Sequence, residues 1–365
     1  MQKTKKKIGI GFVGSGWMGA TLMKRIIENE NTDLIALHQR SKSNAEKTLH
    51  QIGSDKEIYT EKYEELLSNP KVDAVFICSP NSYHGKQSIE ALKAGKHVFC
   101  EKPCATDYNE FLEQIRIANK SPHLVTYVNY LMNFDSLEQR ICEMARDKEF
   151  GEITQIQVNY RHPINIDGEK KWKLSADIMG DAIGMGIIHS LSVMLNIMKA
   201  NGAAASSVFA TRNIKNTRGF ETEPIYNIMI NFDNGSTGFC FGNVDIANGY
   251  DAYHNIHGTK GGLIFDSYLP KPQKVRLWST LSTNGDWVYP LDQNNCPIEY
   301  RWPKETSTPD SGDVVNHQTN ACVQHFIDCI HNNTQSFLSF ENSKDTANVG
   351  WAALKSCRTG KPETV

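Results

Sequence analysis

Short apolar runs alternate with stretches of helical periodicity over residues 8–128 of the chain. The runs have the length of strands and are rich in Val, Ile and Leu; they are Ile8–Val13, Leu34–Leu37, Val72–Cys78, His97–Cys100 and Leu124–Val128. Between them, apolar residues recur every three or four positions, as they do on one face of a helix. Alternation of this kind predicts a parallel sheet with helices on both faces.

The pattern changes after about Asn129. Ile153–Tyr160 alternates apolar and polar residues, as a half-solvated strand should. Farther on, Asp233-Asn234-Gly235 separates two strand-like runs and predicts a hairpin, because Asn and Gly tolerate positive φ. Gly258–Gly262 is a second glycine-rich turn. We therefore expect a large open, mostly antiparallel sheet in this part of the chain, with helices near residues 177–199, 314–332 and 342–358.

The composition favours a soluble chain of two domains. Its 365 residues are too many for one core, and 39 basic against 41 acidic residues give a net charge of −2. That balance offers no basic face for nucleic acid, and no run of about 20 apolar residues predicts a membrane span. The nine cysteines are scattered, odd in number and free of Cys-x-x-Cys pairs. We expect reduced thiols in a cytoplasmic protein, with no metal site.

A glycine pattern follows the first predicted strand directly and opens a predicted helix. Gly14, Gly16 and Gly19 stand in the spacing G-x-G-x-x-G. In such a turn, the first glycine makes the bend, the second lets the backbone approach a pyrophosphate, and the third allows close helix–strand packing. Trp17 and Met18 begin the helix whose amides would face the pyrophosphate. We expect an α/β chain with a Rossmann NAD(P)-binding domain over residues 1–128 and a second α/β domain over residues 129–365.

The end of the second predicted strand bears on the choice between NAD and NADP. An acidic residue about 20 positions beyond the glycines normally binds the ribose hydroxyls of NAD. Here that position holds Gln39, followed by Arg40 and Ser41. Without a carboxylate to repel it, a 2′-phosphate could make charge-assisted hydrogen bonds to these residues. The sequence favours NADP, and the alternative is NAD with Gln39 bound to its ribose.

Two further motifs carry a family resemblance. Val72–Asn81 is followed closely by His84, and Ala94–Pro103 ends in the triplet Glu101-Lys102-Pro103. With these motifs, the chain resembles the Gfo/Idh/MocA family, named for glucose–fructose oxidoreductase, inositol dehydrogenase and a rhizopine-catabolism protein. The resemblance implies a Rossmann domain and an open α/β domain whose sheet commonly forms oligomer contacts. It implies a homodimer or homotetramer acting on a small carbohydrate or polyol.

The resemblance also implies that both motifs contribute to the cofactor site, through Ser79, Pro80, Asn81, His84, Glu101 and Lys102. Hydride transfer at a carbinol carbon requires a matching proton transfer at its hydroxyl. Lys102 follows a predicted parallel strand at the carboxyl edge where such sheets bind ligands, and partial desolvation would lower the pKa of its amine. We expect Lys102 to act in catalysis and to bind substrate.

The second half of the family site is a histidine on a helix of the second domain, preceded four residues earlier by an aspartate. His189 matches this histidine, but Met185 stands where the aspartate is expected. Asp181, eight residues before His189, could share its helix face if the helix is regular. The predicted catalytic residues are therefore Lys102, His189 and Asp181.

The resemblance implies a substrate site that includes Asn129, Trp172 and Met185 beside Lys102 and His189. Trp172-Lys173 is similar to the family's Trp–basic pair, whereas Asn133 stands where many relatives carry an arginine. The favoured function is a dehydrogenase or reductase of a sugar, inositol or related polyol. The alternatives are an NAD-dependent glycosidase that acts by transient oxidation and a dinucleotide-sensing protein without catalytic activity.

Overall fold

The computed structural model describes residues 6–246, 254–266, 273–286, 288, 299–300 and 318–365. The chain divides into two compact units. Unit 1 contains residues 1–130, 177–180 and 319–344, and unit 2 contains residues 131–176, 181–318 and 345–365. Residues 319–344 thus belong to the first unit, although most of the second unit precedes them in the sequence.

A six-stranded sheet forms the centre of unit 1, and every strand pair in it is parallel. The strands lie in the order β3-β2-β1-β4-β5-β6. Their bounds are β1 Ile8–Val13, β2 Thr32–His38, β3 Tyr59–Thr60, β4 Ala74–Ile77, β5 His97–Cys100 and β6 Thr126–Val128. The predicted parallel sheet is confirmed. The strand order reverses between β1 and β4, and ligands of such sheets bind beyond the carboxyl ends of the strands at that point.

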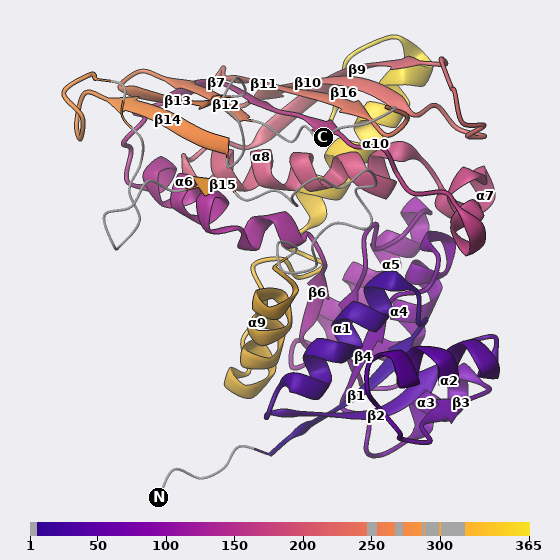
Figure 1. Ribbon diagram of the computed structural model, residues 1–365. Helices are drawn as coiled ribbons and strands as arrows, with labels where there is room; N and C mark the ends of the chain where they lie inside the picture. The colour runs from indigo at the N-terminus through magenta and orange to yellow at the C-terminus, as the bar shows by residue number, and fades with distance from the viewer. Residues whose placement is uncertain (1–5, 247–253, 267–272, 287, 289–298, 301–317) are drawn as a thin grey trace, which may run out of the picture. The chain divides into compact units, whose positions relative to one another are not determined.

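Helices cover the sheet of unit 1. Their bounds are α1 Trp17–Glu28, α2 Lys42–Gln51, α3 Tyr63–Ser68, α4 His84–Lys93, α5 Tyr108–Lys120 and α9 Thr319–Asn332. α1 packs beside α9, and α4 beside α5 (Figure 1). The ring of Phe326, on α9, meets Phe76 and Phe99 edge-on at centroid distances of 5.5 and 5.6 Å. This aromatic contact explains why α9, although late in the sequence, belongs to the first unit.

Unit 2 is built on a ten-stranded mixed sheet, most of whose pairs are antiparallel. Its order is β15-β14-β13-β12-β7-β11-β10-β9-β16, and β8 pairs with β11 beside it. The bounds are β7 Ile153–Val158, β8 Tyr160–Arg161, β9 Ala205–Asn213, β10 Ile225–Phe232, β11 Thr237–Asn243, β12 His254–Gly258, β13 Gly261–Asp266, β14 Gln273–Ser279, β15 Glu299–Tyr300 and β16 Glu363–Thr364. β10 and β11 form the predicted hairpin around Asn234-Gly235. The predicted mostly antiparallel sheet is confirmed.

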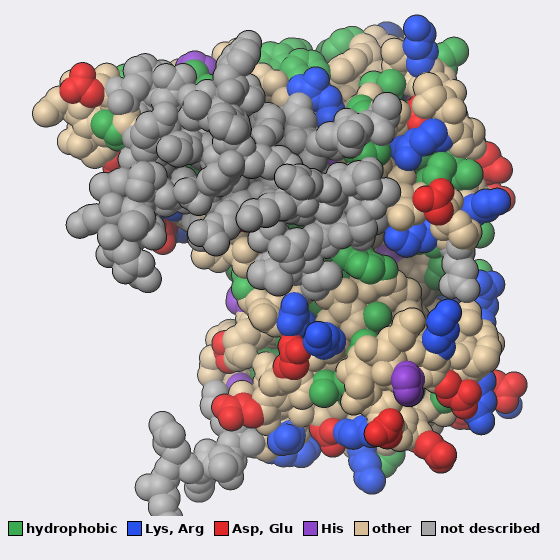
Figure 2. Space-filling view, in the orientation of Figure 1, with side chains coloured by type: hydrophobic (Ala, Val, Ile, Leu, Met, Phe, Trp, Pro, Cys, Tyr) green, Lys and Arg blue, Asp and Glu red, His purple; other side chains and the backbone are tan. Residues whose placement is uncertain are grey.

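α6 (Ser136–Arg146) and α8 (Ile188–Ala200) lie on one face of this sheet (Figure 1). α10 spans Lys344–Thr359, close to the predicted helix. Among the described residues, only the stretch Ile183–Ala200 is long and apolar enough to cross a membrane, and 83% of it is buried inside the structure. That burial is the pattern of a core helix. On the surface shown in Figure 2, acidic and basic side chains are interspersed over the described residues.

The predicted helix near 177–199 is interrupted. A short α7 covers Ala176–Met179, Gly180 takes a φ of +84°, and a π-helical turn over Ile183–Ile187 leads into α8. A Cβ at Gly180 would lie 2.9 Å from the side chain of Thr106, which belongs to unit 1, as Gly180 itself does. The chain therefore bends at Gly180 for a tertiary reason. The predicted helix near 314–332 begins at Thr319, and residues 314–317 lie outside the described residues.

Candidate cofactor and active site

The first and third glycines of the motif are required by close packing. Gly14 has a φ of +89°, and a Cβ there would lie 2.6 Å from the carbonyl oxygen of Cys78, at the end of β4. A Cβ at Gly19 would lie 2.5 Å from the carbonyl oxygen of Gly14. A side chain at either position would push the turn away from the sheet or from α1. The turn therefore holds the start of α1 close to the carboxyl ends of β1 and β4.

The second glycine faces open space. Gly16 is exposed, has an ordinary φ of −63°, and has no heavy atom within 4 Å of the position of a Cβ. It is the N-cap of α1, where no side chain caps the helix and the first turn has no acidic residue. The amide groups at the start of a helix receive no hydrogen bond from within the helix, and with the positive end of the helix dipole they form a site suited to an anion. The residues present fit the pyrophosphate of a dinucleotide.

The loop after β2 contains the residues predicted to select the cofactor. Ser41 is the N-cap of α2, and its Oγ accepts a hydrogen bond from the backbone N–H of Asn44 at 3.3 Å. Arg40 is exposed, Gln39 is half-buried, and the first turn of α2 has no acidic residue. Neither this loop nor the first turn of α2 thus contributes an acidic side chain, and the nearest one on the helix, Glu46, pairs with Lys42 at 3.7 Å.

Beyond β4, His84 joins two loops. Its Nδ1 lies 2.7 Å from the carbonyl oxygen of Pro103, and its Nε2 lies 2.7 Å from that of Ser79. Burial lowers the pKa of His84, while the two carbonyl contacts act in the opposite direction. The ring is almost fully buried and ties the loop after β4 to the loop after β5, which carries Lys102. Asn81 is also buried, and its Nδ2 donates to the carbonyl oxygen of Met179 at 2.8 Å.

The Glu-Lys-Pro triplet directly follows β5. Nδ2 of Asn129 donates a hydrogen bond to Oε1 of Glu101 at 2.5 Å, and both side chains are buried. Burial raises the pKa of Glu101, and the neighbouring Lys102 and the bond from Asn129 counteract it. Lys102 itself is half-buried at the carboxyl edge of the sheet, and its peptide bond to Pro103 is cis. Lys102 was predicted from the sequence to lie at this carboxyl edge.

In unit 2, His189 lies in the first turn of α8 and is 6% exposed. The ring of Tyr160 stacks with the His189 ring at a centroid distance of 6.2 Å. The same Tyr160 ring stacks with the ring of His162 at a centroid distance of 5.5 Å. Gly186 makes room for this arrangement, because a Cβ there would lie 2.6 Å from the Tyr160 ring. His162 is not among the site residues predicted from the sequence. The available signal was the spacing of Tyr160 and His162, because side chains two residues apart in extended chain point to the same face.

Asp181 precedes the π-helical turn. Its Oδ1 accepts a hydrogen bond from the backbone N–H of Gly184 at 2.8 Å, as an N-cap does, and burial raises its pKa. Five π-helical residues separate this cap from α8, so the regular-helix spacing assumed between Asp181 and His189 does not apply. Met185, within that turn, is half-buried.

Three further residues of unit 2 that the sequence analysis named are Asn133, Trp172 and Lys173. Asn133 donates to Oγ of Ser192 at 2.9 Å and accepts from Nδ2 of Asn196 at 2.6 Å, both on α8. Trp172 and Lys173 lie in a 3₁₀ turn over Gly168–Leu174. Trp172 is half-buried, whereas Lys173 is only 8% exposed.

Two family models match the chain. Residues 8–130 match the oxidoreductase family with an NAD-binding Rossmann fold, and residues 139–264 match the Gfo/Idh/MocA C-terminal domain. Together these matches cover more than half of the sequence. The chain belongs to the Gfo/Idh/MocA family of oxidoreductases. It is therefore an NAD-binding oxidoreductase, as the resemblance implies.

Three relatives are distant in sequence, but they match most of the chain. The chain is 29% identical over 278 residues to the uncharacterized oxidoreductase YrbE of Bacillus subtilis, covering 74% of this chain and 77% of the relative. It is 23% identical over 357 residues to scyllo-inositol 2-dehydrogenase (NAD(+)) of the same organism, covering 96% and 94%. Its fold is similar to that of aldose-aldose oxidoreductase from Caulobacter crescentus, with a TM-score of 0.78, 22% identity, and coverage of 99% and 100%.

In this family member, the predicted site residues are divided between the two units. The glycine turn, the loop after β2, Lys102 and Asn129 belong to unit 1. Trp172, Asp181, Met185 and His189 belong to unit 2. Each half has the local geometry described above, and the pairing of Lys102 with His189 in one reaction stays a prediction.

Proposed function

We propose that this protein is an NAD(P)-dependent dehydrogenase or reductase that transfers hydride between nicotinamide and a carbinol or keto carbon of a sugar, inositol or related polyol. The observation that carries the proposal is the uncapped first turn of α1 at Gly16, beside a carboxyl edge that presents Lys102. The names of relatives support the substrate class, since they include an inositol dehydrogenase and an aldose oxidoreductase. They do not favour a glycosidase.

The bound dinucleotide supplies hydride chemistry at its nicotinamide. The protein must hold the substrate and move one proton at the reacting oxygen. We propose that Lys102 Nζ and the His189 imidazole hold that oxygen and exchange the proton with it. The buried Glu101 carboxylate, fixed by Asn129, stabilises positive charge on the neighbouring Lys102, and His84 fixes the loop that carries both.

A substrate panel tests this function. Inositols, aldoses and reduced sugars are each incubated with NAD or NADP, and reduced nicotinamide is followed by its absorbance. We expect at least one polyol to be oxidised. Hydrolysis of a nitrophenyl glycoside without added cofactor, with no net oxidation of any polyol, would replace this proposal with the glycosidase.

We further propose that NADP is the preferred cofactor. Support comes from the exposed Arg40 and from the absence of an acidic residue at positions 39–43 and in the first turn of α2. An NAD ribose bound by Gln39 is the alternative, and the name of the B. subtilis inositol dehydrogenase specifies NAD.

Arg40→Ala should distinguish these cofactors. If Arg40 binds the 2′-phosphate, the substitution should weaken NADP binding by about tenfold, because a charge-assisted contact is lost. NAD binding should change by less than twofold. Arg116→Ala, at another exposed arginine of the same unit, is the control. Equal losses for both cofactors, or a wild type that prefers NAD, would assign the position to Gln39 and the ribose.

We also propose a homodimer or homotetramer in a reducing cytoplasm. The solvent face of the large sheet carries a row of half-buried apolar side chains on neighbouring strands, Phe209, Met229 and Phe239, with the exposed Phe241 beside it. Such a row is suited to contact with a second copy. All eight described cysteines are free thiols. Sedimentation velocity tests the assembly, and a monomer at micromolar concentration would contradict it.

A further inference from the structure

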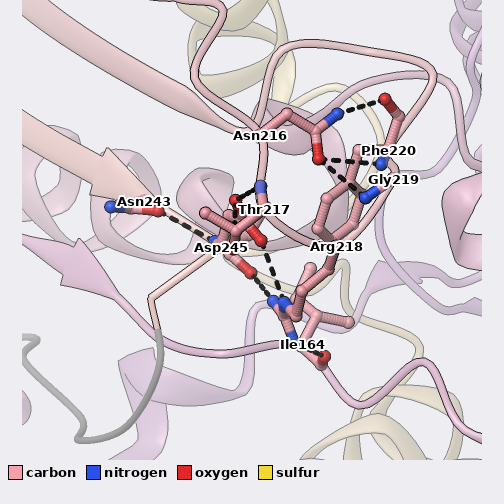
Figure 3. Close-up of polar contacts among 9 residues, drawn as sticks. Ile164, Asn216, Thr217, Arg218, Gly219, Phe220, Asn243 and Asp245 are labelled. Atoms are coloured by element: carbon pink, nitrogen blue, oxygen red, sulfur yellow. Dashed lines mark hydrogen bonds and ion pairs between the residues drawn. The ribbon is translucent and has the colours of Figure 1, made fainter.

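The loop between β9 and β10 has a fixed internal structure. Oδ1 of Asn216 accepts hydrogen bonds from the backbone N–H groups of Gly219 and Phe220 at 2.9 and 3.0 Å, and its Nδ2 donates to the carbonyl oxygen of Phe220 (Figure 3). The amide side chain thus closes a tight turn around residues 216–220. We call residues 214–221 the clamp loop.

Arg218 projects from this turn and binds two other chain segments. Its Nε donates to Oδ1 of Asp245 at 2.9 Å and its Nη1 to the carbonyl oxygen of Ile164 at 2.7 Å (Figure 3). Its Nη2 donates to the carbonyl oxygen of Val244. Ile164 follows β8, and Val244 follows β11. The guanidinium also lies 5.3 Å from the centroid of the Phe220 ring. One side chain therefore joins the clamp loop to the segments after β8 and β11.

Asp245 completes this junction. The exposed fraction of its side chain is 2%, and its Oδ2 accepts from both the backbone N–H and the Oγ1 of Thr217, at 2.5 and 3.0 Å. A buried ion pair contributes little net stability, but it fixes geometry when the remaining polar atoms are also satisfied. The planar guanidinium has several donors at fixed angles, which a lysine cannot reproduce.

The other end of the clamp loop holds the same neighbouring segment at a second place. The backbone N–H of Glu221 donates to the carbonyl oxygen of Leu174 at 2.9 Å. Oε2 of Glu221 accepts from the backbone N–H of Ala176 at 2.8 Å. Residues 164–176 are thus attached to the clamp loop near both ends, at Ile164 through Arg218 and at Leu174 and Ala176 through Glu221. Between the attachments lies the 3₁₀ turn with Trp172 and Lys173.

We propose that the clamp loop positions the turn containing Trp172 and Lys173 for substrate binding, with Arg218 as one of its positioning residues. Arg218 acts through the backbone of the attached segment. The inference rests on the proposed function and on the substrate site that the family resemblance implies, which includes Trp172. It predicts that changes at Arg218 alter substrate recognition while cofactor binding, in unit 1, stays unchanged.

The test compares Arg218→Lys with wild type. Lysine keeps the charge beside Asp245, so the fold is preserved, but one ammonium cannot bind both carbonyl oxygens and the carboxylate in the same geometry. We expect KM for the polyol to rise about tenfold, with kcat and the cofactor Kd within about twofold. Amide hydrogen exchange over residues 164–176 should become faster. The double variant Arg218→Met/Asp245→Asn, which leaves no unpaired buried charge, should show the same pattern more strongly.

Arg212→Met is the matched control. Arg212, on β9, forms an ion pair at 2.7 Å with Glu223, which lies just before β10, and the contacts described for it do not include residues 164–176. We expect unchanged KM and exchange in this variant. Unchanged exchange over 164–176 in Arg218→Lys overturns the clamp, and faster exchange with unchanged KM overturns its role in recognition. If wild type oxidises no polyol, the proposed function fails, and the exchange comparison still decides whether Arg218 holds the segment.

Discussion

Replacing Lys102 by Met, or His189 by Ala, should lower kcat by a factor on the order of 10²–10⁴, the usual contribution of a general acid–base group. Lys102 stands at the carboxyl edge of the unit 1 sheet, next to the buried Glu101. His189 lies at the start of α8 against the Tyr160 ring. We expect neither residue to contact the pyrophosphate or the adenosine, so the Kd of the cofactor should change far less than kcat.

The double variant provides the internal check. If the two groups move one proton as a unit, the double variant should lower kcat by less than the product of the two single reductions. Steady-state kinetics with the best polyol of the panel, and calorimetric titration of the cofactor, give both quantities. Near-normal turnover in His189→Ala would place His189 in the core alone and leave Lys102 as the proton-transfer residue.

Two substitutions at Asp181 test whether its carboxylate only caps the π-helical turn or also supports proton transfer. As a helix cap only, its carboxylate can be replaced by the amide of Asn, whose oxygen still accepts from Gly184; Asp181→Asn should then keep wild-type kcat. Asp181→Ala should lower the free energy of unfolding by about 1 kcal/mol through the lost cap. If Asp181 instead supports proton transfer at His189, Asp181→Asn should lose activity as Asp181→Ala does.

Gly16→Val should weaken cofactor binding at least tenfold, a loss of about 1.4 kcal/mol or more. The φ of −63° and the open space around the position mean that valine introduces no backbone strain and no collision within the protein. Its side chain would occupy the space through which a pyrophosphate approaches the α1 amides.

Gly16→Ala is the graded control, with a smaller side chain at the same position and a smaller expected loss. Calorimetry measures the affinity, and thermal unfolding of the free protein should give an unchanged Tm in both variants. Wild-type affinity in Gly16→Val would remove this turn from the cofactor site.

Much of unit 1 could be predicted from local sequence. Its strands are buried on both faces and therefore appear as continuous apolar runs, and Gly14 and Gly19 are needed wherever a strand turns sharply into a helix. The hairpin at Asn234-Gly235 was predictable for the same kind of reason, since the turn requires positive φ at Gly235, which is +85°. For Gly19, which packs on the carbonyl oxygen of Gly14, and for the hairpin turn, the determining interaction lies within a few residues of the chain.

The interruption at Gly180 and the return of α9 to unit 1 were not predictable in this way. Gly180 bends against Thr106, and Phe326 packs on Phe76 and Phe99, partners far away in sequence. Local periodicity cannot register such contacts, because it reports which face of a segment is apolar and not what covers that face.

The candidate site shows the same division. The glycine turn and the candidate residues Lys102 and His189 could be named from the sequence alone, because the glycines and Lys102 stand in motifs of fixed spacing and His189 matches the position of the family's histidine. Only the tertiary structure decided that Asp181 caps a π-helical turn, that His162 joins the ring stack, and that Arg218 clamps the Trp172 segment. Those assignments depend on hydrogen bonds and ring contacts between segments up to 54 residues apart. The chain folds these segments together through burial of its sheets, and no local pattern encodes which polar groups then meet.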